Sequence, residues 1–111
     1  GNSATGGSGG GIIAYGVATL INTTVSNNTA PFAGGGISTN NVTLINSTVS
    51  GNTGGQGSGI TNYASPGGTA NVTLINSTVS NNSGGSSGIK SFGGSNTLTL
   101  INSIVANNSC S

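Results

Sequence analysis

Short runs in which apolar and polar residues alternate recur four times along the chain. Residues 41–52 read Asn-Val-Thr-Leu-Ile-Asn-Ser-Thr-Val-Ser-Gly-Asn, residues 71–82 repeat them almost letter for letter, and residues 18–28 and 98–108 are looser copies. Alternation rich in β-branched residues and bounded by Gly, Ser and Asn is typical of strands joined by tight turns. No segment carries the apolar stripe of a helix. The pattern predicts an all-β fold.

The spacing of the repeats predicts how these strands are arranged. The Leu-Ile-Asn triplets begin at Leu20, Leu44, Leu74 and Leu100, which are 24, 30 and 26 residues apart. A second mark, a small residue followed by Gly-Ile, recurs before each triplet and ends at Ile12, Ile37, Ile60 and Ile89. The interval from a triplet to the next Gly-Ile is nearly constant, whereas the following interval varies, so insertions fall in one arc of each repeat. Repeats of this length are typical of a solenoid.

Stacking the four copies places like residues on like. We therefore predict a parallel β-helix of about four coils over residues 11–111, in which each strand pairs with its copies above and below. Residues 1–10 form either a Gly/Ser-rich leader or part of a preceding turn. The columns predicted to point inward contain Ala18, Val42, Val72 and Leu98; Leu20, Leu44, Leu74 and Leu100; Val25, Val49, Val79 and Val105; and the four Gly-Ile isoleucines.

The two marks together carry a family resemblance. Small-Gly-Ile followed by hydrophobe-x-x-Asn, as in Val49 to Asn52 and Val79 to Asn82, resembles the repeats of polymorphic outer-membrane proteins and related bacterial right-handed β-helix surface proteins. That family usually has Phe where this chain has Val. The resemblance covers nearly the whole chain and implies a right-handed coil, a secreted or surface-displayed location, and adhesion or passenger roles. It supplies no catalytic residue to carry over.

Charged side chains are almost absent, and this excludes several classes of function. Lys90 is the only charged side chain, and the chain has no Asp, Glu, His or Arg. General acid/base chemistry therefore has no candidate pair, and no hard anionic ligands exist for a metal, so we expect neither an enzyme nor a cofactor. One Lys does not make a nucleic-acid patch. No apolar run reaches the roughly 20 residues of a membrane span.

Asparagines recur at two positions of every repeat. Both columns are predicted to be structural ladders, because Asn tolerates left-handed backbone and can satisfy backbone groups that a bend leaves unpaired. Several of these residues lie in glycosylation sequons. If an Asn points into a bend it cannot carry a glycan, so Asn46 and Asn76 are poor acceptors, and Asn41 and Asn71 are the better candidates. The first asparagine column is Asn22, Asn46, Asn76 and Asn102, and the second is Asn28, Asn52, Asn82 and Asn108.

The outer face of the repeated strand is unusual because it is apolar and uncharged. If Val42 and Leu44 point inward, Thr43 and Ile45 point outward, and a patch of this kind usually marks a binding surface. We interpret it as a lateral contact with another copy; the alternative is that a loop of the same chain covers Ile45 or that the bend shifts Ile45 inward. The resulting Thr/Ile strip consists of Thr19, Ile21, Thr43, Ile45, Thr73, Ile75, Thr99 and Ile101.

Two further features have open interpretations. Tyr15, Tyr63 and Phe92 each lie three residues after a Gly-Ile isoleucine, with Asn40 at that position in the second repeat. We interpret these rings as anchors of the variable arc, with a sugar-stacking platform as the alternative. Cys110 is the single cysteine, so it is either an inert thiol or a partner in an intermolecular disulfide in an oxidising compartment.

These observations favour a non-catalytic structural protein that assembles with copies of itself. The leading hypothesis is a subunit of an extracellular filament or surface fibre, built by stacking coils end to end and by packing them side by side. The alternatives are a fragment of a β-helical adhesin or autotransporter passenger stalk, and a solenoid that binds ice or another ordered lattice. The chain begins at Gly1 without Met, so we expect a processed chain or a piece of a longer one. A contact with a glycan or with a surface is a further expectation.

Overall fold

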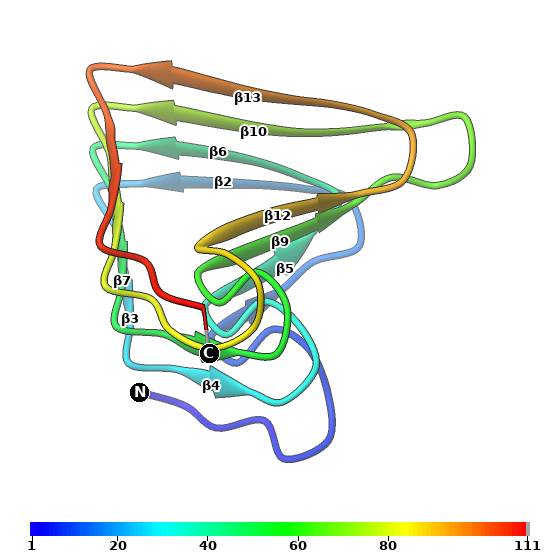
Figure 1. Ribbon diagram of the computed structural model, residues 1–111. Coiled ribbons are helices and arrows are strands. Elements are labelled where there is room, and N and C mark those ends of the chain that lie inside the picture. The colour runs from blue at the N-terminus through cyan, green and yellow to red at the C-terminus, as the bar shows by residue number, and fades with distance from the viewer. Residues whose placement is uncertain (111) are drawn as a thin grey trace.

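The computed structural model describes residues 1–110 as a parallel β-solenoid of about four coils, without a helix in that range (Figure 1). Each coil contributes one strand to each of three walls, and every strand pairs in parallel with its copies in neighbouring coils. The first wall is β1 (Ile12–Ile13), β5 (Ile37–Thr39), β9 (Ile60–Tyr63) and β12 (Ile89–Phe92). The second is β2 (Val17–Ile21), β6 (Asn41–Ile45), β10 (Thr69–Ile75) and β13 (Ser95–Ile101). The third is β3 (Thr24–Ser26), β7 (Thr48–Ser50), β11 (Thr78–Ser80) and β14 (Ile104–Ala106).

The pairing register confirms the prediction that equivalent residues of successive repeats stack on one another. Leu44 lies opposite Leu20 on one side and Leu74 on the other, and Leu74 lies opposite Leu100. A short pair, β4 (Thr29–Ala30) and β8 (Thr53–Gly54), extends the ladder beyond the third wall. The added residues of the longer repeats lengthen β10 and β13 to seven residues each. The segment between β9 and β10 projects from the second wall in Figure 1, so the insertion leaves the rest of the coil in register.

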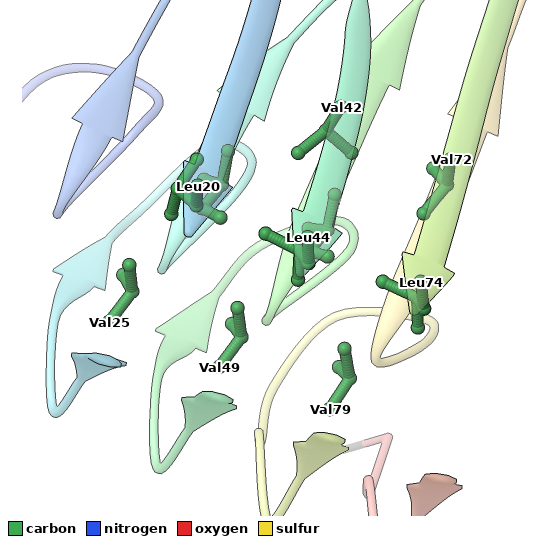
Figure 2. Close-up of a cluster of buried hydrophobic side chains, with 10 residues drawn as sticks. Leu20, Val25, Val42, Leu44, Val49, Val72, Leu74 and Val79 are labelled. Carbon is green, nitrogen blue, oxygen red and sulfur yellow. The ribbon is translucent and has the colours of Figure 1, made fainter. Parts of the chain in front are cut away.

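The core is a stack of aliphatic rows enclosed by the three walls. Leu44, Val49, Ile60 and Leu74 are completely buried, and Figure 2 shows the leucines and valines of successive coils lying in parallel rows. In the strand from Asn41 to Ile45, burial alternates between half-buried and buried residues, because successive side chains of a strand point to opposite faces. The apolar rows of the middle coils are thereby removed from water.

The first ten residues lie along the first coil. The Asn2 N–H donates to Asn28 Oδ1 at 2.7 Å, Ser3 forms a parallel bridge with Thr29, and the Gly9 N–H donates to the Ala33 carbonyl at 2.9 Å. The bridges between Thr53 and Ser83 and between Ser83 and Ser109 continue the same row. Asn2 and Ser3 therefore occupy, one coil earlier, the positions that Asn28 and Thr29 occupy in the next.

Two corners of each coil place asparagine or, once, glycine in the left-handed region. The first corner is the first asparagine column, in which φ is 51° at Asn22 and 49° at Asn46. The second corner precedes the second asparagine column and has φ of 57° at Asn27, 64° at Gly51 and 54° at Asn81. Gly51 takes the place of Asn at this corner in one coil, and Gly and Asn are the residues that adopt this backbone at little cost.

The first asparagine column forms one link of the ladder that the sequence predicts. Asn46 and Asn76 are exposed, and one side-chain bond links them, from Asn76 Nδ2 to Asn46 Oδ1 at 3.3 Å. The following residue bonds the backbone instead: the Ser47 N–H donates to Ser77 Oγ at 3.1 Å, and Ser47 Oγ donates to the Ile45 carbonyl at 2.8 Å. The left-handed backbone turns the Asn side chain outward, so the expectation that Asn46 and Asn76 point into the bend is wrong.

The second asparagine column forms a continuous buried ladder. Asn52 Oδ1 accepts from the Asn28 backbone N–H at 2.9 Å and from Asn28 Nδ2 at 3.0 Å. Asn52 Nδ2 donates to the Val25 carbonyl at 3.0 Å and to Asn82 Oδ1 at 2.9 Å, and Asn82 repeats the pattern toward Asn108. Each amide therefore satisfies backbone groups of two coils at once.

Asn52→Ala should destabilise the solenoid strongly. The substitution leaves the Asn28 N–H, the Val25 carbonyl and Asn82 Oδ1 without these partners, and a buried unpaired group costs about 1–3 kcal/mol. We expect the free energy of unfolding, measured by chemical denaturation, to fall by about 3 kcal/mol or more. The matched control is Asn71→Ala on the half-buried outer face, which should change it by less than about 0.5 kcal/mol. Equal losses in the two variants would contradict the ladder's role.

Candidate assembly surfaces

The Thr/Ile strip lies on the outer face of the second wall. Thr43 pairs in register with Thr19 and Thr73, and Ile45 pairs with Ile21 and Ile75. Ile45 and Ile75 are half-buried between their neighbours, whereas Ile21 at one end of the column is 56% exposed. The eight side chains thus form two adjacent columns across four strands. The asparagines Asn41 and Asn71 lie on the same outer face, two residues before Thr43 and Thr73.

A second uncharged outer face, on the third wall, was not singled out from the sequence. Thr24, Thr48 and Thr78 form an in-register column on β3, β7 and β11, continued by Ile104 on β14. The signal is the Thr-Val-Ser of the first three repeats, in which only the Val is buried. The solenoid therefore presents Thr columns on two neighbouring walls.

The last coil exposes the rows that are buried in the middle of the solenoid. Leu98 and Leu100 are 49% and 46% exposed, whereas Val72 and Leu74, their partners in β10, are completely buried. Val105 is 39% exposed on β14, whereas its partner Val79 in β11 is completely buried. Leu98, Leu100 and Val105 point toward the core space of their own coil, so an adjoining coil in the same register would bury them.

A hollow lies at each end of the described solenoid. The hollow at the last coil has a volume of about 440 Å³ and is lined by Ile89, Leu98, Val105 and Asn108 among others. The hollow at the first coil, of about 380 Å³, includes Ile12, Val25 and Asn28 in its lining. Both are open ends of the aliphatic interior, lined by members of the same columns.

The candidate modification sites lie at different places on this scaffold. Asn41 and Asn71 are half-buried, and Asn41 Oδ1 accepts a hydrogen bond from the Asn71 backbone N–H at 2.9 Å. Cys110 is free and exposed, and it lines the hollow at the last coil. The candidate glycan acceptors therefore lie in the wall beside the Thr/Ile strip, and the thiol lies at the rim of an open end.

The aromatic column is partly stacked. Tyr63 and Phe92 are partners in the register of β9 and β12, and their rings stack with centroids 5.1 Å apart and planes 10° apart. Lys90 Nζ lies 5.5 Å from the centroid of the Phe92 ring. Asn40 interrupts the column, and its Nδ2 donates to the Tyr63 carbonyl at 2.7 Å. Tyr15, the remaining ring, is 94% exposed.

Comparison with known proteins leaves the fold as the main guide to function. No family model, curated protein or solved structure matches the chain. Within residues 1–110 no helix is long and apolar enough to cross a membrane. The chain is defined by its structure as a parallel β-solenoid repeat protein with a buried asparagine ladder.

The structure perturbs the titration of Tyr63. Burial raises the pKa of its phenol, and a hydrogen bond from Ser8 partly opposes this. The folded chain therefore holds the proton more tightly than the unfolded chain does. Stability from this group is complete below the unfolded pKa of about 10 and is lost as the pH rises through the folded pKa.

The free energy of unfolding should stay level from about pH 4 to pH 9, since no side-chain carboxylate or imidazole exists to titrate there, and should decline above about pH 10. Tyr63→Phe should reduce the alkaline decline. Denaturation midpoints measured across this range would check both statements. An unchanged decline in the Tyr63→Phe variant would show that another process causes it.

Proposed function

We propose that this protein is a non-catalytic structural subunit that assembles with copies of itself into a fibre by stacking coil on coil. The observation that carries the proposal is the exposure of Leu98, Leu100 and Val105 in the same register as the buried rows. Solenoid repeats that cannot bury their apolar rows within the chain bury them against a neighbouring repeat. A second copy offers that repeat with a matching sequence.

Extending the observed register gives the contacts of such a joint. β13 of one copy pairs with β2 of the next, so Leu98 lies beside Ala18 and Leu100 beside Leu20. β14 pairs with β3, so Val105 lies beside Val25. Parallel pairing also satisfies the backbone groups that the free edges of β13 and β14 leave to solvent. The joint repeats along one axis without closing, which gives a filament.

The joint requires one rearrangement. Asn108 and Ser109 of one copy have the same position in the coil as Asn2 and Ser3 of the next, because all four belong to one row of bridges and ladder bonds. In the stack, one of these segments has to leave the ladder. Asn108-Ser109 has the same sequence as Asn2-Ser3, so the Asn108 N–H can replace the Asn2 N–H as the donor to Asn28 Oδ1.

The uncharged surface supports side-by-side contact in addition. The Thr/Ile strip carries no charged residue, and its two columns follow the axis of the solenoid, so a neighbouring filament meets the same surface along its whole length. Little charge repulsion opposes such packing, since the net charge is +1. We propose this strip as the lateral contact.

The family resemblance supports a place outside the cell. Polymorphic outer-membrane protein-like repeats imply a secreted or surface-displayed protein, and the single free Cys110 at an open end suits a disulfide between copies there. The same resemblance supports the second candidate function, a segment of an adhesin or passenger stalk, in which the adjoining coil belongs to the same polypeptide. The two Thr columns on neighbouring walls support the third candidate, binding to ice or another ordered lattice.

Electron microscopy and analytical ultracentrifugation of the 111-residue chain test the fibre. We expect filaments with an axial repeat of about 19 Å per subunit, which is four strand spacings, and little change with salt. Leu98→Glu should abolish filaments and leave a folded monomer, because it places a charge in the joint at a residue that is already half exposed. Gln56→Glu, which adds the same charge at an exposed residue of a middle coil, is the control and should assemble normally.

The lateral contact is tested separately with Thr73→Lys in the middle of the strip. We expect filaments of normal length that no longer bundle, because like charges then repeat along the contact surface. Particles that stay monomeric at all concentrations for the unaltered chain would refute the fibre and favour the stalk. Ice shaping by such monomers would favour the lattice-binding face.

A further inference from the structure

A hollow on the outer face of the first wall is separate from the surfaces that the proposed assembly uses. It has a volume of about 240 Å³ and lies between the rings of Tyr15 and Tyr63. β1 and β5, with the residue that follows each of them, supply the rest of its lining, and the segment before β1 supplies Ser8. The residues that matter for its chemistry are Ser8, Ile13, Tyr15, Ser38, Asn40 and Tyr63.

Tyr15 has no structural task that explains an aromatic residue at its position. Tyr63 and Phe92 stack on one another and so hold the variable arc to the wall, as the sequence interpretation expects. Tyr15 is 94% exposed, so it anchors nothing in its own chain. An exposed tyrosine at the rim of a hollow offers an apolar ring face together with a hydroxyl, which is the usual chemistry of a recognition surface.

Asn40 makes the hollow possible. It takes the column position that an aromatic residue takes in the other three coils, and its smaller side chain leaves room between Tyr15 and Tyr63. Its Nδ2 is held by the Tyr63 carbonyl at 2.7 Å, which fixes the amide. Its Oδ1 receives no donor from the described residues and remains an acceptor for a ligand hydroxyl. The amide is therefore preorganised.

The lining selects against charged ligands. It contains no charged side chain, and Lys90, the one cation of the chain, lies over Phe92 instead. A phosphate or carboxylate would lose its hydration without gaining a counter-charge. The lining suits a ring with an apolar face and several neutral hydroxyls: C–H groups pack on the negative face of an aromatic ring, and hydroxyls bond amide and serine oxygens.

We propose that this hollow binds one neutral pyranose ring of a saccharide. A volume of about 240 Å³ lies below the roughly 300 Å³ of the smallest drug-sized pockets, which fits a single ring better than a longer ligand. The ring lies against Tyr15, and Asn40 Oδ1, Ser38 and Ser8 offer polar partners around it. The hollow is on the outside of the first wall. Of its lining residues, only Ser8 belongs to the N-terminal segment that stacking can displace, so the part formed by Tyr15, Asn40 and Tyr63 stays open whether or not coils stack at the ends.

Nuclear magnetic resonance titration of the isotope-labelled chain with methyl β-glucoside, methyl β-galactoside and methyl α-mannoside tests the site. We expect at least one glycoside to give saturable shift changes confined to the neighbourhood of Tyr15, Asn40 and Tyr63. Tyr15→Ala should weaken that binding at least about tenfold, and Tyr15→Phe should largely keep it, because the ring face remains. The exposed ring of Phe32 supplies the control Phe32→Ala, which should bind as the unaltered chain does.

Three outcomes would overturn the proposal. One is the absence of saturable shifts with all three glycosides; another is binding that Tyr15→Ala and Asn40→Ala leave unchanged in spectra that show both variants folded. The third is stronger binding of glucuronate than of the neutral glycosides. Repeating the titration with the Leu98→Glu monomer separates this site from assembly, because saccharide binding should persist there.

Discussion

The whole structure depends on each coil lying in register on the next. Parallel strands pair their backbone groups between coils, so any angular position of the coil meets its own copy about 4.8 Å away. A residue that suits a position once therefore suits it in every coil. The leucine rows, the left-handed corners and the Asn52 ladder are consequences of this one constraint. The long insertion between β9 and β10 is tolerated because it projects outward and leaves the register intact.

Register also explains why polar residues can lie inside a narrow core. The amide of Asn82 is completely buried, yet it bonds the Val49 carbonyl and Asn108 Oδ1, at 3.1 and 2.9 Å. A side chain with one donor group and one acceptor group can bond forward and backward along the axis, whereas an aliphatic residue would leave the corner backbone unpaired. The ladder thus ends only where the coils end. The same open-ended geometry leaves Leu98 and Leu100 half exposed and motivates the fibre.

The sequence interpretation fails where a side-chain direction depends on a corner's backbone. Asn46 is at a corner as predicted, but its φ of 49° turns the amide outward, and the neighbouring Ser47 makes the backbone bonds. The second left-handed corner, at Gly51 and Asn81, was not recognised, although the shared preference of Gly and Asn for this backbone is a visible signal. The sequence also does not predict the hollow beside Tyr15, because its shape depends on how closely the Tyr63 and Phe92 rings stack.

The sequence by itself determined the all-β class, the number of coils, the inward columns and the near-absence of charged side chains. Those features follow from periodicity and composition, which are local and repeat four times. The tertiary structure alone decided which polar residue bonds the backbone at each corner, that Asn2 and Ser3 join the ladder, and that Tyr15 stands free while Tyr63 is stacked. These depend on distances between coils and on backbone dihedrals, and residue order does not specify either one directly.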